Sequence, residues 1–311
     1  MTVGEFHERF GTQEACLGHL RRVRWGTDLE RFVCPECGHT HGWWLAKRQL
    51  VECAECHRQT SVTAGTVFHG VRSPLWQWFW AVYQLAQDTE GDQGGSPKGI
   101  GAIELAKQVG VSYTTACLML HKLRAAMRSR EQRYSLRGLV EVDGCYVGGQ
   151  AHDGSTGRGA RSKTPVAVAV ELTPDGKPGH IALETVARVN SRSLTRFAKR
   201  HISRGAMLKT DGWGAYDNVA AAGYQHRTIV TGGGAGAIEA FPWMHTFISN
   251  AKRMILGTYH HVKAKHLDHY LAEFIYRANR RWREESLFDR LLIAALGTKA
   301  VTYRQLVTGG S

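Results

Sequence analysis

The chain has 311 residues, of which 43% are apolar. That length suits one large domain or about two to three smaller ones, and the composition excludes a disordered chain. Forty Lys and Arg against 27 Asp and Glu give a formal net charge of +13, which favours a nucleic acid as the first candidate partner and an anionic membrane as the second. No apolar stretch reaches the roughly 18 residues of a membrane span, and residues 1–10 lack the layout of a secretory signal. We therefore expect a cytoplasmic protein without a membrane anchor.

Four of the seven cysteines form two Cys-x-x-Cys pairs, Cys34 with Cys37 and Cys53 with Cys56. Two such turns can place four thiolates around one Zn²⁺, while segment 42–51 between them forms short strands. A module of about 40 residues has too little core to fold alone, so the metal supplies the missing stability. The repeated spacing favours this zinc ribbon over a redox pair or four unrelated buried cysteines. The remaining cysteines, expected in the core, are Cys16, Cys117 and Cys145.

The segment after the ribbon predicts helices. Residues 74–85 begin with proline and carry aromatic side chains over about three turns, which is typical of a buried helix rather than of a base-stacking surface. Residues 102–109 and 113–127 predict a helix-turn-helix, with Gly110 at the turn and Ser112 capping the second helix, although any short helical hairpin can produce this spacing. The residues that the second helix would present outward to a DNA major groove are Tyr113, Thr114, Thr115, Lys122, Arg124 and Arg128. The expected shared core consists of Ile103, Ala106, Val109, Val111, Ala116, Leu120 and Leu123.

From residue 137 onward the pattern is that of an α/β domain. The stretch 139–149 alternates apolar and polar residues and then reaches paired glycines, so it predicts a strand that delivers Asp143 near a tight turn, with Glu141 on the same face. A carboxylate on an inner face is costly unless it is paired or bound to a cation. The elements expected next are strands over 165–172 and 180–186, a helix over 191–202, strands over 207–212 and 224–230, a glycine-rich loop over 231–237 and a helix over 241–258. This order predicts a mixed five-stranded sheet with helices.

Two acids at strand ends and one amide on a helix are candidates for a catalytic site. Asp143 and Asp211 lie near the ends of predicted strands, and Asn250 lies on the last helix above. Oxygen ligands that converge from different elements suit two hard divalent cations and phosphodiester transfer. In this interpretation Asp143 bridges both ions, Asp211 holds one, and Asn250 completes the coordination of the other. Taken singly, each aspartate is also typical of a turn.

Several motifs resemble one known family. They are Glu141-Val-Asp143-Gly-Cys-Tyr-Val-Gly-Gly149, Lys209-Thr-Asp211-Gly-Trp-Gly-Ala-Tyr216, His245-Thr-Phe-Ile-Ser-Asn250-Ala-Lys252, Gly257-Thr-Tyr-His260-His261 and Arg277-Ala-Asn279-Arg280-Arg281. With the cysteine pairs, they are similar to the ISXO-like insertion-sequence transposases over nearly the whole chain, from about residue 34 to residue 281. The resemblance implies an RNase H-like catalytic domain of the DDE type, which binds Mg²⁺ or Mn²⁺, cuts DNA at the ends of an insertion sequence and joins the freed 3′ ends to a target.

The resemblance also implies roles for individual residues. Asp143 matches the first catalytic acid and Asp211 the second, while Asn250 stands where other DDE transposases have Glu. A neutral amide gives such a site one negative charge fewer than three carboxylates would. The alternatives for the third ligand are His245 and Glu239.

Two groups of basic residues near these motifs are further candidates for DNA binding. Arg158, Arg161 and Lys163 lie in the glycine-rich loop after the Asp143 strand. Lys252 and Arg253 follow Asn250 closely, and they could hold the phosphate beside the scissile bond or simply face solvent.

A third basic group consists of Arg277, Arg280, Arg281 and Arg283. Their helical spacing over 268–283 predicts a stripe of guanidinium groups, which suits a phosphate backbone. The alternative is that they form salt bridges to Glu273, Glu284 and Glu285.

We expect three domains: residues 1–70 with the zinc ribbon, 71–136 with the helix-turn-helix, and 137–311 with the RNase H-like domain and C-terminal helices. The favoured function is a DNA transposase, nucleoid-associated in bacteria, that binds terminal inverted repeats and target DNA as at least a dimer. The alternatives are a transposase-derived DNA-binding regulator and a metal-dependent nuclease or resolvase. The two intact aspartates disfavour the regulator, and the ribbon with the helix-turn-helix disfavours the nuclease.

Overall fold

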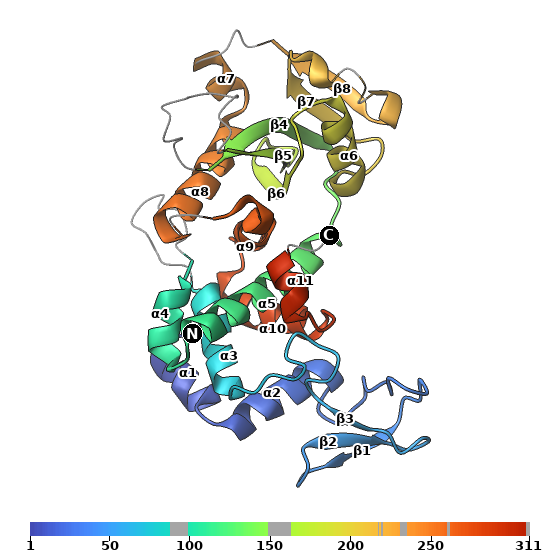
Figure 1. The fold of residues 1–311 in the computed structure, drawn as a ribbon. Coiled ribbons are helices and arrows are strands. Elements are labelled where there is room, and N and C mark those ends of the chain that lie inside the picture. The colour runs from blue at the N-terminus through green and yellow to red at the C-terminus, as the bar shows by residue number, and fades with distance from the viewer. Residues whose placement is uncertain are drawn as a thin grey trace. The chain divides into compact units, whose positions relative to one another are not determined.

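The computed structural model describes residues 1–87, 99–148, 163–216, 218, 220–230, 235–259 and 262–308 (Figure 1). The chain divides into two compact units. The N-terminal unit comprises Met1–Gln87, Ile100–Ser129 and Trp282–Ser311, and the sheet unit comprises Asp88–Gly99 and Arg130–Arg281. The expected division into three domains stays a prediction, and the two units divide the chain elsewhere: residues 282–311 belong with the N-terminal unit.

Helices from both ends of the chain form the core of the N-terminal unit. Helices α1 (Val3–Phe10), α2 (Gln13–Trp25) and α3 (Leu75–Ala86) pack with α10 (Leu287–Leu296), and α11 (Tyr303–Thr308) follows. Phe10 lies 5.0 Å from Phe79 and 5.2 Å from Phe288 between ring centroids. The aromatic helix expected over 74–85 is therefore α3, and its buried rings are core side chains. The sequence reading had assigned no structure to the segments that form α1 and α2.

The predicted helical hairpin is present, but two of its cations face inward. Helix α4 (Ala102–Val109) ends at Gly110, which has φ 67°, and the Ser112 hydroxyl accepts from the backbone N–H of Thr115 at the start of α5 (Tyr113–Glu131). The expectation that Lys122 and Arg124 point outward is wrong, because their exposed fractions are 8% and 2%. The opposite holds for Ile103, which is expected in the shared core and is 63% exposed.

The ribbon is a three-stranded antiparallel sheet, β1 (Gly42–Leu45), β2 (Leu50–Cys53) and β3 (Gln59–Ser61). The strands are short because a Cys-x-x-Cys turn follows β2 and another precedes β1. Residues 62–68, expected to continue as β structure, form turns instead.

The sheet unit contains the mixed five-stranded sheet that the sequence predicts. Its strands are β4 (Leu139–Val147), β5 (Thr164–Leu172), β6 (Pro178–Thr185), β7 (Met207–Asp211) and β8 (Gln225–Ile229). They are ordered β6-β5-β4-β7-β8, with β5 antiparallel to both β4 and β6, and β7 parallel to both β4 and β8. This architecture is consistent with an RNase H-like fold.

Helices cover the two faces of this sheet. Helix α6 (Ser191–His201) packs on the face with Val140 and Val142, and α8 (Pro242–Tyr259) and α9 (Leu267–Ala278) pack on the face with Cys145 and Val147. Helix α7 (Ala235–Ala240) begins inside the glycine-rich loop expected over 231–237. The short 3₁₀ helices are η1 (Gly214–Tyr216), η2 (Ala220–Ala222), η3 (Ala264–His266) and η4 (Glu284–Ser286). None of the helices in the described ranges has the length and apolar character of a bilayer-crossing segment.

Candidate functional site

Two copies of the same local turn bring the four cysteines of the ribbon together. In the first, the Gly38 N–H donates to the Cys34 carbonyl over 3.0 Å; in the second, the His57 N–H donates to the Cys53 carbonyl over 3.1 Å. Gly38 and His57 both have a left-handed backbone, with φ 76° and 56°. Each turn therefore orients its pair of thiols by local backbone geometry, without a contribution from the rest of the chain.

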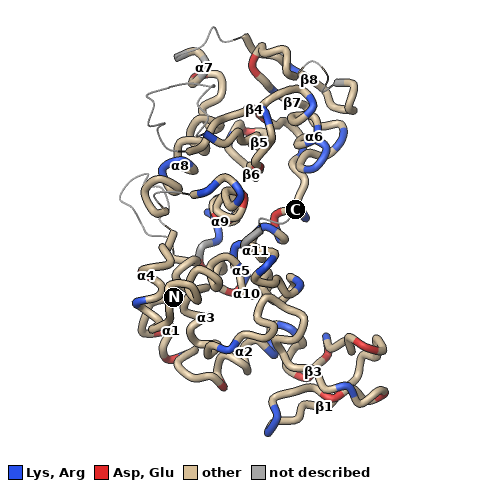
Figure 2. The backbone as a smooth tube through the Cα atoms, in the orientation of Figure 1, with Lys and Arg blue, Asp and Glu red and all other residues tan. Residues whose placement is uncertain are grey.

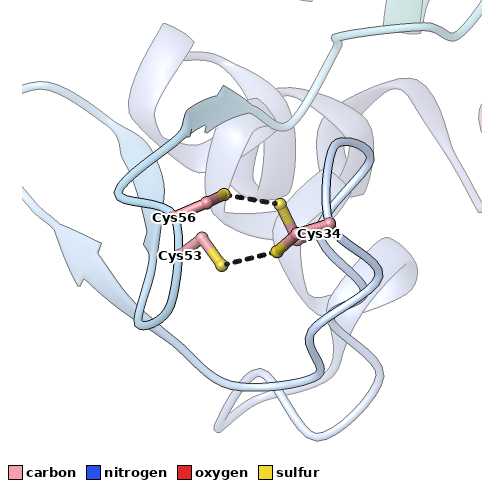
Figure 3. Close-up of side chains that lie close together, drawn as sticks. Cys34, Cys53 and Cys56 are labelled. Atoms are coloured by element: carbon pink, nitrogen blue, oxygen red, sulfur yellow. Dashed lines mark hydrogen bonds between the residues drawn. The ribbon is translucent and has the colours of Figure 1, made fainter.

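The four thiols have the geometry of a zinc site. Their sulfur atoms all lie within 4.8 Å of one another, with Cys34 Sγ 3.6 Å from Cys56 Sγ and Cys37 Sγ 3.6 Å from Cys53 Sγ (Figure 3). A tetrahedron with Zn–S bonds of about 2.3 Å has S···S edges of about 3.8 Å. The Cys37 backbone lowers the pKa of the Cys34 thiol to about 6, and the thiolate is the form that binds metal. The residues present therefore fit Zn²⁺.

The register of two parallel strands brings the two predicted acids together. Strand β4 pairs with β7 through Val140 and Leu208 and then through Glu141 and Lys209. Asp143 and Asp211 lie two residues beyond the last pair of this ladder, and strand alternation places both on the face that α8 covers.

Backbone N–H groups from the following turns orient both carboxylates. The Gly144 N–H donates to Asp143 Oδ1 over 2.6 Å, and the Trp213 N–H donates to Asp211 Oδ1 over 3.2 Å. A side chain at residue 144 would not fit, because a Cβ there would lie 2.3 Å from Val189. The glycine after the first acid is thus required by close packing.

A buried ion pair lies directly beneath the acids on the same face. Glu141 is 1% exposed, and its Oε1 accepts from Lys209 Nζ over 3.0 Å. The same ammonium donates to the Ala240 carbonyl over 2.6 Å and lies 4.8 Å from the Phe241 ring centroid. Lys209 thereby ties β4, β7 and the start of α8 together. The sequence reading noticed Glu141 but not its partner, because a parallel register cannot be read from two separate strands.

Helical spacing separates the candidate residues of α8. Burial raises the pKa of Cys145 to about 12 and the charge of Lys252 acts in the opposite direction, so Lys252 lies near Cys145 of β4. At 3.6 residues per turn, His245 lies within about 20° of Lys252 on this helix, and Asn250 lies about 160° from Lys252. In the described part of the chain, the only group of three or more His, Cys, Asp or Glu side chains that could hold a metal is the cysteine cluster.

The predicted DNA-binding residues differ in exposure. Tyr113 is 59% exposed, Thr114 and Arg253 are exposed, and Thr115, Lys163 and Lys252 are half-buried. Arg158 and Arg161 lie outside the described residues. The residue that turns into the protein beside Trp78 is Lys122, whose Nζ lies 3.4 Å from the Val67 carbonyl and 5.8 Å from the Trp78 ring centroid.

Of the four arginines expected to form an exposed stripe, Arg283 is exposed, and the other three are buried or half-buried. Arg277 is 4% exposed. Arg280 pairs with Glu131 over 2.6 Å rather than with the glutamates suggested by the sequence. Arg281 donates to the carbonyls of Ala278 and Gly179 over 2.6 and 3.3 Å, and burial lowers its pKa to about 10. These guanidinium groups hold the sheet unit together.

Family comparisons agree with both parts of this description. Residues 135–279, which contain the whole five-stranded sheet, match the family described as ISXO2-like transposase domain. Residues 11–59, with all four cysteines, match the family described as transposase zinc-ribbon domain. The chain belongs to the ISXO2-like transposase family. The zinc ribbon and the α/β domain are therefore the two parts of a transposase.

Two further comparisons add little to this assignment. No curated protein matches this transposase. Among solved structures, it is similar to a chain of the simian T-cell lymphotropic virus intasome in complex with PP2A regulatory subunit B56 gamma, at 13% identity and a TM-score of 0.30, over 56% of this chain and 63% of that chain. The transposase thus spans less than two thirds of that chain.

Proposed function

We propose that this transposase cleaves the DNA ends of an insertion sequence and joins them to a target by metal-dependent phosphoryl transfer at Asp143 and Asp211. The observation that supports the proposal is the parallel pairing of β4 with β7, because it places both aspartates on one face of the sheet, two residues beyond the pair of Glu141 with Lys209. Adjacent carboxylates repel each other unless a cation lies between them. Their oxygen atoms are the ligands that Mg²⁺ and Mn²⁺ prefer.

The protein residues supply positioning and charge in this reaction. The N–H groups of Gly144 and Trp213 hold one oxygen of each aspartate and so orient both carboxylates. When bound, such cations activate the attacking water or 3′-hydroxyl and neutralise the leaving oxygen. Lys252, whose charge acts on Cys145 two residues beyond Asp143 in β4, is suited to hold a phosphate beside the acids.

The third ligand is proposed as Asn250, on the family resemblance. Within the described residues no histidine or further carboxylate completes a three-residue group with the two aspartates, which supports a neutral donor. The rotation of α8 makes His245 the competing residue, because His245 shares the flank of Lys252. Asn250→Ala and His245→Ala therefore form a matched pair of variants.

DNA ends are proposed to be recognised by the ribbon together with α4 and α5. The exposed Tyr113 and Thr114 at the start of α5 lie where a helix of this type meets base edges. We also propose that two ends are joined within a homo-oligomer of at least two chains.

A strand-transfer assay tests the catalytic proposal. A labelled duplex with a pre-cut end is incubated with the protein, target DNA and Mg²⁺ or Mn²⁺, and joined products are separated by size. We expect joining that requires the cation and falls by about a thousandfold or more in Asp143→Asn, while end binding remains. Joining by Asp143→Asn at the normal rate would refute the site, and binding without joining by the unaltered protein would favour a DNA-binding regulator.

The pair of α8 variants then assigns the third ligand. If Asn250 is a ligand, Asn250→Ala should lose most joining activity, and its residual joining should need a higher Mg²⁺ concentration. His245→Ala should then keep the joining rate and the Mg²⁺ requirement close to those of the unaltered protein. The reverse pattern would transfer the role to His245.

A further inference from the structure

The face of α6 that points away from the sheet carries a row of cations. Residues 185–210 contain seven Lys and Arg and no Asp or Glu, and Lys and Arg are dense along α6 in Figure 2. Five of these side chains are exposed and, within the described residues, have no carboxylate partner: Arg188, Arg192, Arg196, Lys199 and Arg204. We call these five residues the α6 stripe.

The core of the sheet unit fixes the direction of the stripe. Leu194, Phe197 and Ala198 are buried against the sheet, and at 3.6 residues per turn Arg192, Arg196 and Lys199 lie within about 60° of one another on the opposite side of α6. Glu184, an acid of the described residues that contacts α6, binds Arg200 and His201. It therefore neutralises none of the stripe.

This arrangement is unfavourable for the isolated protein. Arg192 lies in the first turn of α6, which has no acidic residue, although the helix dipole favours negative charge there. Arg192 and Arg196 also repel each other as a like-charged pair four residues apart. Both costs disappear when a polyanion binds the stripe.

We propose that the α6 stripe binds the phosphate backbone of a DNA duplex, at a stretch separate from the one held at the aspartates. Asp143 and Asp211 lie on the face of the sheet that α8 covers, and α6 covers the opposite face. The axial distance from Arg192 to Lys199 is about 10 Å, and a duplex carries about six phosphate charges over that length. The inference rests on the proposed function only in taking DNA as the partner.

The test measures the salt dependence of DNA binding with the variant Arg192→Gln/Arg196→Gln/Lys199→Gln. Each phosphate contact contributes about 0.9 to the slope of log affinity against log salt. We therefore expect the slope to fall by about 2.7 and the affinity at low salt to fall by about tenfold or more. The melting temperature should stay the same or rise, because like charges are removed, so lost binding cannot be ascribed to unfolding. The matched control is Lys177→Gln, whose ammonium is already paired with Asp175 over 2.9 Å, and its slope should not change.

Two duplexes distinguish the sources of the phosphate backbone. A smaller slope on an unrelated duplex assigns the stripe to target DNA, and a smaller slope only on a duplex with the element's end assigns it to DNA beside that end. An unchanged slope on both duplexes overturns the proposal, as does a loss of self-association without any change in slope, which would mean that the stripe binds an acidic protein surface.

The assay is run without divalent cations, so that it needs no catalysis. Asp143→Asn should bind with the normal slope. If strand transfer fails but the stripe variant shows the smaller slope, the proposed reaction is rejected and this inference stands. If strand transfer occurs but the slope of the stripe variant is unchanged, this inference is rejected and the proposed reaction stands.

Discussion

The ribbon and the proposed catalytic site of this transposase are assembled in opposite ways. In the ribbon, each pair of thiols is set by one local turn, and the turn is repeated. In the sheet unit, Asp143 and Asp211 are 68 positions apart and come to one face of the sheet only through the pairing of β4 with β7. We expect the ribbon to need its metal in order to fold, whereas the sheet unit obtains its geometry from a large core. The difference predicts that substitutions of the proposed metal ligands change the stability of the two regions with opposite signs.

The largest effect is expected in the ribbon from Cys53→Ser. A structural zinc supplies about 10 kcal/mol or more of apparent binding free energy, and three thiolates retain little of it. We expect zinc content to fall from one equivalent to near zero and the ribbon amides to lose protection from exchange, while amides of the sheet unit stay protected. Cys117→Ser is the control, because Cys117 lies outside the cluster. Normal zinc content in Cys53→Ser would contradict the four-thiolate site.

The next effect concerns the pairing that brings the acids together. Removing one partner of a buried ion pair typically costs about 3–5 kcal/mol, because the other charge is left buried. Glu141→Gln should therefore lower the free energy of urea unfolding of the sheet unit by about that amount, since it strands the ammonium of Lys209. Glu141→Leu combined with Lys209→Met should recover much of the loss.

An exposed pair provides the control for this prediction. Lys177 and Asp175 are 74% and 58% exposed at their side chains, so Lys177→Gln should cost well under 1 kcal/mol. Equal losses for Glu141→Gln and Lys177→Gln would show that the buried pair does not fix the register of β4 and β7.

These cases also show what the sequence could and could not predict. The cysteine turns and the alternation in β4 are local patterns, so the ribbon, the strand order and the positions of Asp143 and Asp211 followed from the sequence. Helical spacing of arginines predicts only that they share a face. It does not say whether that face meets solvent, and Arg280 turned out to meet Glu131, which is distant in sequence.

The same limit explains why the α6 stripe was overlooked. In the sequence, these arginines only form the polar side of an amphipathic helix. The sequence does not show that Glu184 binds Arg200 and His201, or that Glu184 therefore neutralises none of the stripe. Cations that face the protein interior and cations that face solvent have similar spacing in the sequence, and only tertiary packing decides between the two orientations.

A smaller effect of the opposite sign is expected at the aspartates themselves. As proposed ligands of one pair of cations, the two carboxylates should repel each other in the metal-free protein, by about 1–3 kcal/mol for a separation of about 5 Å and effective dielectric constants between 80 and 20. Asp211→Asn keeps the oxygen that accepts from the Trp213 N–H and removes the repulsion, so it should stabilise the metal-free protein by about that amount. Mg²⁺ should raise the melting temperature of the unaltered protein and leave that of Asp211→Asn nearly unchanged.

A carboxylate that is paired with a cation should behave differently from the two aspartates. Thr173 and Lys177 lower the pKa of Asp175 to about 2, so this group stabilises the folded state above the ordinary pKa of an aspartate and loses that contribution as the pH falls toward 2. Asp175→Asn should therefore lower stability at neutral pH. A loss of stability in Asp211→Asn as well would mean that the two proposed catalytic carboxylates do not repel.

The smallest effect returns to the ribbon, where its two turns differ in one residue. Gly38 adopts its left-handed backbone freely, whereas His57 has a side chain at φ 56°, a conformation that costs a residue with a Cβ about 1 kcal/mol. Because the ribbon folds with its metal, His57→Gly should tighten zinc binding by a few fold in a chelator competition, and Gly38→Ala should weaken it by a similar factor. Weaker zinc binding in His57→Gly would mean that the imidazole contributes more than its backbone costs, for instance through Glu52, whose Oε1 lies 3.8 Å from His57 Nδ1. Glu52→Gln would then reproduce the loss, and the two turns would no longer be equivalent copies of one local structure.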